Sequence, residues 1–303
     1  MTINEYDQWL GVELRHLAAL EAVAEEGSFG RAARRLGYTQ SAVSQQIAQL
    51  EKLVGATLVE RPGGPKAVSL TDAGRLLLRH ADAIVARLHA AQADMAALLE
   101  GEAGPLRVGI LQSVGARLLP ALIQRFKRDF PRVSVQVREG NTAEDLLPLV
   151  EGGELDLAFA ELPLPEGPFE WVELIRDPYV LLVSAGSPLA GRESAPPLKE
   201  LARLPLIGWR TDRDQDLPGV EYAFRSDDNG TVLGLVEAGL GVAVAPRLVL
   251  RPELEGIVGL PFGPRHPPRL LGLAWHKERY RSPAAEAFVE DAIELARDLR
   301  SNE

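Results

Sequence analysis

Apolar residues recur at helical spacing in three short segments close to the start of the chain. Leucines and alanines three or four positions apart predict a first helix over residues 13–26. Ser28 can cap a second helix and Gly37 can end it, because glycine readily adopts the left-handed conformation found at helix ends. Thr39 can cap a third helix that ends near Gly55. Short helices joined by a glycine turn indicate a helix-turn-helix.

The predicted third helix has two unlike faces. Its apolar face comprises Val43, Ile47, Leu50 and Val54. Its other face carries short, uncharged donors and acceptors, namely Gln40, Ser41, Ser44 and Gln45. Amides and hydroxyls read base edges in the major groove of DNA, so we expect this face to contact bases. An ordinary solvated face is the alternative, although such faces more often carry Lys and Glu.

Residues 57–70 predict two short strands around a Pro-Gly-Gly-Pro tip, which Arg61 and Lys66 flank. A basic hairpin beside a helix-turn-helix is typical of a wing, whose cations contact phosphates or the minor groove. A plain β-hairpin is the alternative.

A long helix is predicted from Thr71, its cap, to about Glu100, with Asp72 in the first turn where the helix dipole favours negative charge. Its apolar residues follow alternating steps of four and three: Leu77, Ala81, Ile84, Leu88, Ala91, Met95 and Leu98. A seam of this period is typical of paired helices, so we expect this helix to hold a dimer. A helix lying on its own domain, which usually shows a broader stripe, is the alternative.

Beyond residue 105 the pattern changes to alternating strands and helices. Strands over 106–111, 133–139 and 155–161 alternate with helices over 114–128 and 142–152. This order favours a parallel sheet with right-handed crossovers. A second series has strands over 179–184, 204–209, 221–226 and 241–246 and a helix near 230–239, followed by a strand over 270–276 and a helix over 283–299. Proline-rich crossings at 162–168 and 261–268 suggest two hinged α/β lobes around a cleft.

These patterns predict an α/β protein with three parts. They are a winged helix-turn-helix domain over 1–70, a linker and dimerisation helix over 71–100, and a two-lobed α/β domain over 101–303. The first lobe would take in about 105–161 and 269–303, and the second about 162–268.

Polar residues follow several of the predicted strands. Gln112 and Ser113 follow the first, Asn141 and Thr142 follow the second, and Asp228, Asn229 and Thr231 lie in the second lobe. Ligands of open α/β sheets bind at such strand ends, where free N–H groups at helix starts attract anions. We expect a small anionic ligand here, which could bind without any buried cation. Helix capping alone is the alternative for each position, as in the box-like pair of Asn141 and Glu144.

Three further residues complete the expected ligand-binding set. Trp209 and Arg210 end a strand of the second lobe and could close over a ligand, the indole by packing and the guanidinium by bidentate pairing. Glu161 lies at the first crossing and could meet either lobe.

The charge is unevenly distributed. A formal net charge of -10 argues against a general nucleic-acid coat protein. Between Ser28 and Lys66, however, six basic residues stand against two acidic ones. A polyanion could therefore dock on this segment while the rest of the surface repels it.

Several kinds of chemistry are excluded or receive no support. The sequence contains no cysteine, which excludes disulfides, thiolate nucleophiles, iron–sulfur clusters and cysteine-based oxidant sensing. None of the five histidines pairs with another at metal-ligand spacing, and nucleotide-binding and hydrolase motifs are missing, so we predict no metal, no cofactor and no enzymatic activity. The first ten residues have no apolar segment, and no stretch reaches the ~18 apolar residues of a membrane span. We expect a cytoplasmic protein with no membrane partner.

Residues 14–74 resemble the N-terminal signature of LysR-type transcriptional regulators. The matching positions are Ser28, Phe29, Ala32, Ala33, Leu36, Gln40, Ala42, Val43, Ser44, Ile47, Leu50, Glu51, Gly55, Leu58, Arg61, Leu70, Thr71 and Gly74. The C-terminal part is more loosely similar to the effector domain of that family, which has a periplasmic-binding-protein-like fold. Its clearest matches are the segments GLGVAVAP and SPLA.

The resemblance implies a regulator that binds duplex DNA, senses a small effector between two lobes and forms a homodimer, often a dimer of dimers. The implied DNA contacts are Gln40, Ser41 and Ser44 to bases, with Arg34 or Arg35 and Arg61 as backbone or wing contacts. Thr39, Gln45 and Lys66 complete the expected DNA-binding set, and RNA polymerase is a further expected partner. Many members have Pro where this chain has Ser41, and Arg where it has Gln45. The first change keeps a capable helix start, and the second would cost a phosphate contact.

Two other functions stay open. The two-lobed part could be catalytic, as in porphobilinogen deaminases of related fold, but those attach their cofactor through a cysteine, which this chain lacks. The chain could also be a constitutive architectural DNA binder with no ligand.

Overall fold

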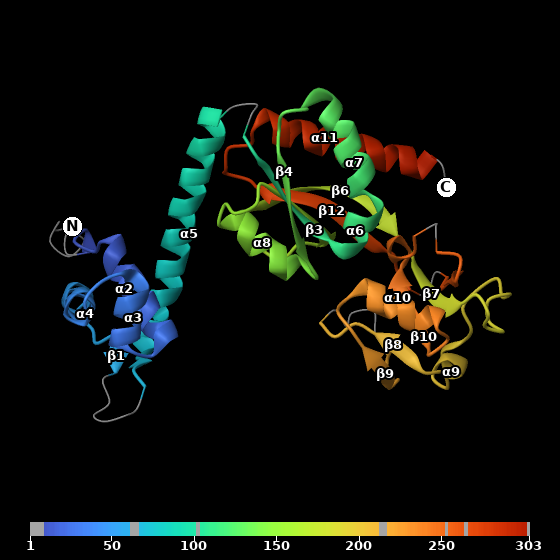
Figure 1. Cartoon of the computed structure of the whole chain (residues 1–303), viewed down its shortest axis with the longest axis horizontal. Helices are drawn as coiled ribbons and strands as arrows, with labels where there is room; N and C mark the ends of the chain where they lie inside the picture. The colour runs from blue at the N-terminus through green and yellow to red at the C-terminus, as the bar shows by residue number, and fades with distance from the viewer. Residues whose placement is uncertain are drawn as a thin grey trace. The chain divides into compact units, whose positions relative to one another are not determined.

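The computed structural model describes residues 9–60, 67–100, 104–211, 217–251, 254–263 and 266–301. The chain divides into two compact units, residues 1–88 and 89–303, and the long helix α5 contributes to both (Figure 1). Among the described residues, no helix combines the length and the apolar character that a membrane crossing requires.

The N-terminal unit is a small helical domain with a two-stranded hairpin. Its elements are α2 (Leu14–Glu26), α3 (Phe29–Leu36), α4 (Gln40–Val54), β1 (Val59–Glu60), β2 (Ser69–Leu70) and the first part of α5 (Asp72–Glu100). The strands pair antiparallel, and Leu20, Ile47 and Leu58 are fully buried at the centre of the domain. The three helices and the hairpin strands predicted from the sequence are confirmed.

α5 begins as its sequence predicts. The Gly74 N–H donates to Oγ1 of Thr71 at 3.0 Å, and the Thr71 hydroxyl donates to the Thr57 carbonyl at 2.7 Å. The first two positions of the predicted dimerisation seam need a correction, because Leu77 and Ala81 are buried in the core of the N-terminal unit. The exposed part of the seam starts at Ile84, since apolar side chains already packed inside their own domain are not free to meet a partner.

The C-terminal unit has two five-stranded sheets. The first lobe contains β3 (Leu106–Leu111), α6 (Gln112–Arg117), α7 (Leu119–Asp129), β4 (Val135–Gly140), α8 (Ala143–Glu151), β5 (Leu157–Leu162), β6 (Phe169–Asp177), β12 (Arg269–His276) and α11 (Pro283–Ser301). The second lobe contains β7 (Tyr179–Ser184), α9 (Leu198–Leu201), β8 (Leu206–Gly208), β9 (Tyr222–Arg225), α10 (Asn229–Glu237), β10 (Val242–Pro246), the short 3-10 helix η2 (Arg247–Val249) and β11 (Ile257–Pro261). Figure 1 shows both lobes in this unit.

Both sheets are mixed. In the first, with strand order β4-β3-β5-β12-β6, β3 pairs parallel with β4 and β5, as predicted, whereas β12 pairs antiparallel with β5 and β6. In the second, with order β11-β7-β10-β8-β9, β8 pairs parallel with β10 and β9, and β7 runs antiparallel to β10 and β11.

The predicted boundary between the lobes was wrong. Residues 169–177 form β6, an edge strand of the first lobe, so the chain first crosses at Pro178 and not at 162–168. Only Leu174 and Asp177 of β6 are fully buried, and its charged residues hide the strand pattern in the sequence. The second crossing, between β11 and β12, lies where the sequence predicted it.

Candidate DNA-reading face and ligand cavity

Caps fix the start and end of α3 and the start of α4. The Arg31 N–H donates to Oγ of Ser28, and Gly37 ends α3 with a φ of 71°. The Ala42 N–H donates to Oγ1 of Thr39 at 3.2 Å, which starts α4. Serine and threonine caps satisfy N–H groups that a helix start leaves open, so this sequence fixes where α4 begins.

α4 has the two faces that the sequence predicted. Val43, Ile47 and Leu50 are fully buried. On the other side Gln40, Ser41 and Gln45 are exposed, and Ser44 is half-buried. The exposed face therefore presents amides and hydroxyls to solvent.

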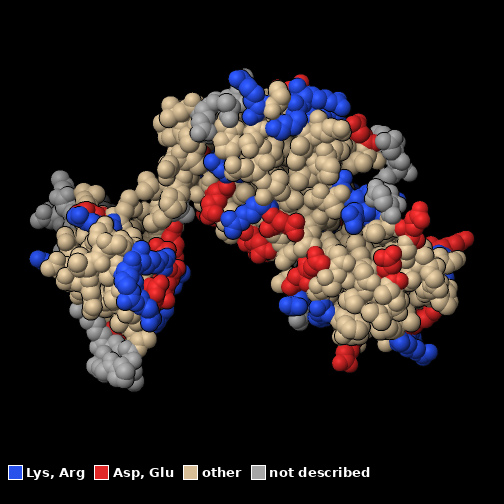
Figure 2. Space-filling view, viewed as in Figure 1, with Lys and Arg blue, Asp and Glu red and all other residues tan. Residues whose placement is uncertain are grey.

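The basic residues next to this face differ in their surroundings. Arg34 and Arg35 lie exposed in the last turn of α3, and Arg35 forms an ion pair with Glu25 of α2. Figure 2 shows basic side chains gathered on the N-terminal unit with acidic side chains beside them. A phosphate contact by Arg35 would compete with Glu25. Arg61 and Lys66 lie outside the described residues.

A cavity of about 40 Å³ lies between the two lobes of the C-terminal unit. It is lined by Leu111, Gln112, Ser113, Asn141, Trp209, Thr211, Asp227, Asn229, Pro246, Val249 and Arg269. Five of the predicted ligand-binding residues are therefore brought together, namely Gln112, Ser113, Asn141, Trp209 and Asn229.

Gln112 ties the lobes together beside this cavity. Its Nε2 donates to Oδ1 of Asn141 at 3.0 Å and to the Asp227 carbonyl at 2.9 Å. Its Oε1 accepts from the Asn229 N–H at 2.9 Å. Gln112 belongs to the first lobe, and both the nitrogen and the oxygen of its side-chain amide form hydrogen bonds with the backbone of the second lobe.

Arg269, which the sequence analysis did not identify, supplies a buried cation to the cavity. Its Nη2 donates to Oγ of Ser113 at 3.0 Å and to Oδ2 of Asp177 at 2.7 Å. Its Nε is buried and has no hydrogen-bond partner. Burial raises the pKa of the Asp177 carboxyl, against the charge and hydrogen bond of Arg269 and the Leu248 N–H, which lower it. The cavity therefore has a buried cation on its lining, which the sequence analysis did not anticipate.

The second lobe contributes a polar wall to the cavity. The Trp209 indole N–H donates to Oδ1 of Asn229 at 2.9 Å. Asp227 accepts from the N–H and hydroxyl of Thr211 and from the Arg210 N–H, at 2.8 to 3.0 Å. Desolvation acts to raise the pKa of Asp227, but these hydrogen bonds and the charge of Arg210 outweigh it and lower the pKa. Asp227 therefore stays ionised, and its carboxylate accepts hydrogen bonds from neighbouring residues of its own lobe.

Five predicted residues do not border the cavity, namely Thr142, Glu161, Arg210, Asp228 and Thr231. Thr142 caps α8 in a reciprocal box with Asp145, which replaces the expected pair of Asn141 and Glu144. Thr231 donates to Oδ1 of Asp228 through both its N–H and its hydroxyl. For these two threonines the capping interpretation is the correct one.

Both units match known families. Residues 14–75 match the family of bacterial regulatory helix-turn-helix proteins of the lysR type, and residues 99–297 match the LysR substrate binding domain. The uncharacterized HTH-type transcriptional regulator YnfL of Escherichia coli K12 is 35% identical over 293 residues, 92% of this chain and 97% of its own length. The dual regulator OxyR of Escherichia coli K12 is 30% identical over 276 residues, 87% of this chain and 89% of its own length.

Solved structures agree with these matches. A full-length OxyR variant from Pseudomonas aeruginosa has a TM-score of 0.60 and 27% identity, and the match covers 93% of this chain and 97% of that one. CbnR in complex with its target DNA, at 21% identity, shares the fold with a TM-score of 0.64 over 94% of this chain and all of that one.

The domain order, the capped helix-turn-helix and the two-lobed ligand domain thus agree with both family matches. The chain belongs to the LysR family and is a LysR-type, DNA-binding transcriptional regulator controlled by a small-molecule effector.

Proposed function

We propose that this regulator reads duplex DNA with the exposed face of α4 and responds to a small anion that Arg269 and Ser113 bind in the cavity between the lobes. The observation that carries the proposal is the Nε of Arg269, which is buried without a partner in a residue that borders the cavity.

An unpaired N–H of a buried guanidinium favours an acceptor. Buried polar groups almost always have hydrogen-bond partners, and leaving one unpaired costs free energy. Two of the bonds of Arg269 go to Ser113 and Asp177, which leaves Nε for a ligand. Hydrogen bonds between a cation and an anion are about twice as strong as neutral ones, so a carboxylate or a similar anion suits this position.

The size of the cavity limits the ligand. One water molecule needs a cavity of roughly 10 to 15 Å³, so the cavity of about 40 Å³ holds only a few non-hydrogen atoms. Leu111, Trp209 and Val249 supply apolar wall beside the polar groups. A short carboxylate, with one charged end and a small apolar body, fits this lining.

The names of some relatives refer to hydrogen peroxide as a signal. Close matches are named hydrogen peroxide-inducible genes activators. The sequence of this chain contains no cysteine, so any response to peroxide would need chemistry other than a thiol. A reversible, non-covalent ligand is the simpler function for the cavity.

A thermal-shift screen tests the proposal. The full chain is heated with small carboxylates, inorganic anions and neutral compounds of matched size. A ligand that binds only the folded protein raises its stability by RT ln(1 + [L]/Kd), so the binding anion raises Tm in a dose-dependent way. The Arg269→Lys variant should lose that shift, and Arg176→Lys on exposed β6 should keep it. Stabilisation by neutral compounds alone would contradict the proposal.

We further propose that α5 holds a homodimer, and that dimers pair into a dimer of dimers. Ile84, Leu88, Met95 and Leu98 are each about half exposed, at heptad spacing along one stripe. Exposed apolar residues in such a seam favour a second helix as the partner.

The protein would act on bacterial DNA in the cytoplasm beside RNA polymerase, as a regulator and not as an enzyme.

A further inference from the structure

The last turns of α5 belong to the C-terminal unit. Residues 89–100 cluster with that unit, whereas Leu77, earlier on the same helix, lies in the core of the N-terminal unit. Ala90 is 1% exposed and the Asp94 side chain is 25% exposed. Residues four apart on a helix share a face, so Ala90 and Asp94 mark the face of α5 that meets the first lobe.

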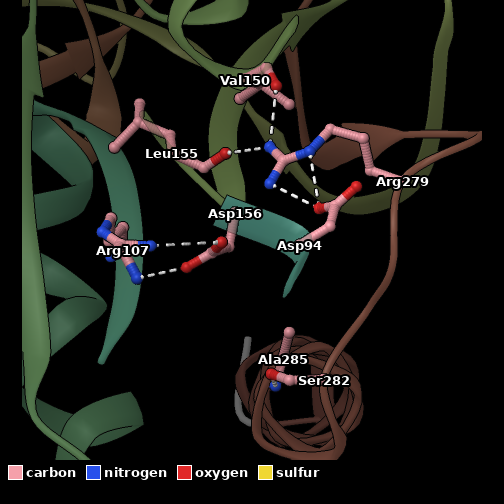
Figure 3. Close-up of polar contacts among 8 residues, drawn as sticks. All are labelled: Asp94, Arg107, Val150, Leu155, Asp156, Arg279, Ser282 and Ala285. Carbon is pink, nitrogen blue, oxygen red and sulfur yellow. Dashed lines mark hydrogen bonds and ion pairs between the residues drawn. The ribbon is translucent and has the colours of Figure 1, made fainter. Parts of the chain in front are cut away.

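Arg279 joins this face to the first lobe (Figure 3). It lies just after β12, and its side chain is only 7% exposed. Its Nε and Nη2 donate to Oδ1 of Asp94 at 3.0 and 2.9 Å. Its Nη1 donates to the carbonyls of Val150 and Leu155, both at 3.1 Å. One guanidinium therefore connects α5, the end of α8 and the segment before β5.

A glycine contact beside the ion pair brings the backbones together. Gly153 follows α8 with a φ of 82°, and a Cβ there would lie 2.6 Å from Cα of Ala90. Only glycine combines this conformation with so close an approach. The turn after α8 and α5 therefore pack backbone to backbone, one helical turn from Asp94.

A second, partly buried pair of charged residues lies next to the Arg279–Asp94 ion pair. Asp156 accepts from the Arg107 N–H at 2.8 Å, and its other carboxylate oxygen lies 3.9 Å from Nη1 of Arg107 (Figure 3). Desolvation raises the pKa of Asp156, while the charges of Arg107 and Arg279 lower it. Arg107 thus pairs with Asp156, and Arg279 pairs with Asp94.

The same stretch of α5 keeps another face open. Leu88, Met95 and Leu98 are about half exposed, although Ala90 and Asp94 between them are held by the first lobe. One segment can thus hold a lobe and meet a partner helix at the same time.

We propose that Arg279 is a positioning residue that fixes the end of α5 to the first lobe and so couples the ligand-binding lobes to the DNA-binding half. α5 is continuous from the core of the N-terminal unit to the segment that Arg279 and Gly153 hold, so we expect a change in the first lobe to reach the N-terminal unit through that segment. The coupling does not depend on which ligand binds. It would hold even if the ligand of the cavity were not an anion.

Hydrogen–deuterium exchange of the full chain tests the attachment. Asp94→Asn keeps the shape of the side chain and removes its charge, so amides of residues 89–100 should exchange roughly fivefold faster or more, while α4 stays unchanged. Asp82→Asn, the same change at an exposed position of α5, should alter neither segment. Gly153→Ala should accelerate the same amides by wedging against Ala90 without touching the ion pair. Parent-like exchange in both Asp94→Asn and Gly153→Ala would overturn the proposal, and so would an equal effect of Asp82→Asn.

DNA bending tests the coupling itself. The probe is a duplex that the parent protein selects from a random-sequence pool, labelled at both ends to report its bend by energy transfer. With the coupling, Asp94→Asn binds this duplex with parent affinity but bends it by a different angle, and Asp82→Asn matches the parent in both. A purely structural role would leave the bend angle unchanged or lower affinity and bending together, and either result overturns the proposal.

Discussion

Arg269 and Asp177 face each other across neighbouring strands and form an ion pair with 2.7 Å between Nη2 and Oδ2. Their side chains are 8% and 1% exposed. Asp177 ends β6 just before the first crossing, Arg269 begins β12 just after the second, and Asp177 also accepts from the Leu248 N–H in the second lobe at 3.0 Å. The ion pair therefore lies at both connections between the lobes and next to the cavity.

Removing the charge of Asp177 should destabilise the C-terminal unit. Asp177→Asn leaves Arg269 buried without its counter-ion, a change that costs 3 to 5 kcal/mol on general grounds. Because burial raises the pKa of Asp177, part of that cost is recovered, and we expect about 3 kcal/mol in denaturant unfolding. Glu173→Gln, which breaks the exposed pair with Arg176, should cost less than about 1 kcal/mol.

The burial of Asp177 gives a pH dependence with a defined sign. The pKa of Asp177 is raised in the folded state, so its contribution to stability is present below the ordinary pKa of 3.8 and is lost as pH rises through the folded-state pKa. Unfolding free energies measured from pH 3.5 upward should show this loss in the parent and not in Asp177→Asn. Identical pH profiles would refute the assignment.

Gln40 is predicted to read a base edge, because it lies exposed at the start of α4. Gln40→Ala should weaken binding to the preferred duplex by about 1 to 3 kcal/mol and change binding to random DNA little. The matched control is Gln49→Ala, an exposed glutamine nine residues further along the same helix, on its opposite side. Equal losses on both duplexes would show that Gln40 does not recognise sequence.

The dimer is predicted to depend on the exposed part of the α5 seam. Leu88→Asp places a charge in the middle of that seam and should dissociate the dimer at micromolar concentration in sedimentation experiments. Leu77→Asp should instead unfold the N-terminal unit, because Leu77 lies in its core. A dimer that survives Leu88→Asp would place the interface elsewhere.

Substitutions of Ser113 and Thr142 should differ in their effect on the affinity for the ligand. Ser113 borders the cavity, so Ser113→Ala should weaken the anion found by the screen by about 1.5 to 3 kcal/mol, a tenfold to hundredfold loss. Thr142→Ala should leave that affinity unchanged, because Thr142 caps α8 away from the cavity. Calorimetric titration measures both, and a loss confined to Thr142→Ala would contradict the assigned site.

The local elements could be predicted from sequence where a short signal determines them. Ser28, Gly37 and Thr39 specify the helix-turn-helix through caps between near neighbours. β6 was missed because its burial depends on β12, about 100 residues later. Arg269 was missed for the same reason, since its partners Ser113 and Asp177 lie 156 and 92 residues away in the chain. Thr142 and Thr231 were assigned to the site because a cap and a ligand contact look alike in sequence.

Calorimetric titration of the anion selected by the thermal-shift screen into the parent, Arg269→Lys and Arg176→Lys tests the central claim most directly. Lysine keeps the charge of Arg269 but cannot present the N–H that Nε supplies beside bonds to Ser113 and Asp177. The account predicts a tenfold to hundredfold weaker affinity in Arg269→Lys and parent affinity in Arg176→Lys. Equal affinities in all three proteins would show that Arg269 does not bind the effector, and would contradict the account.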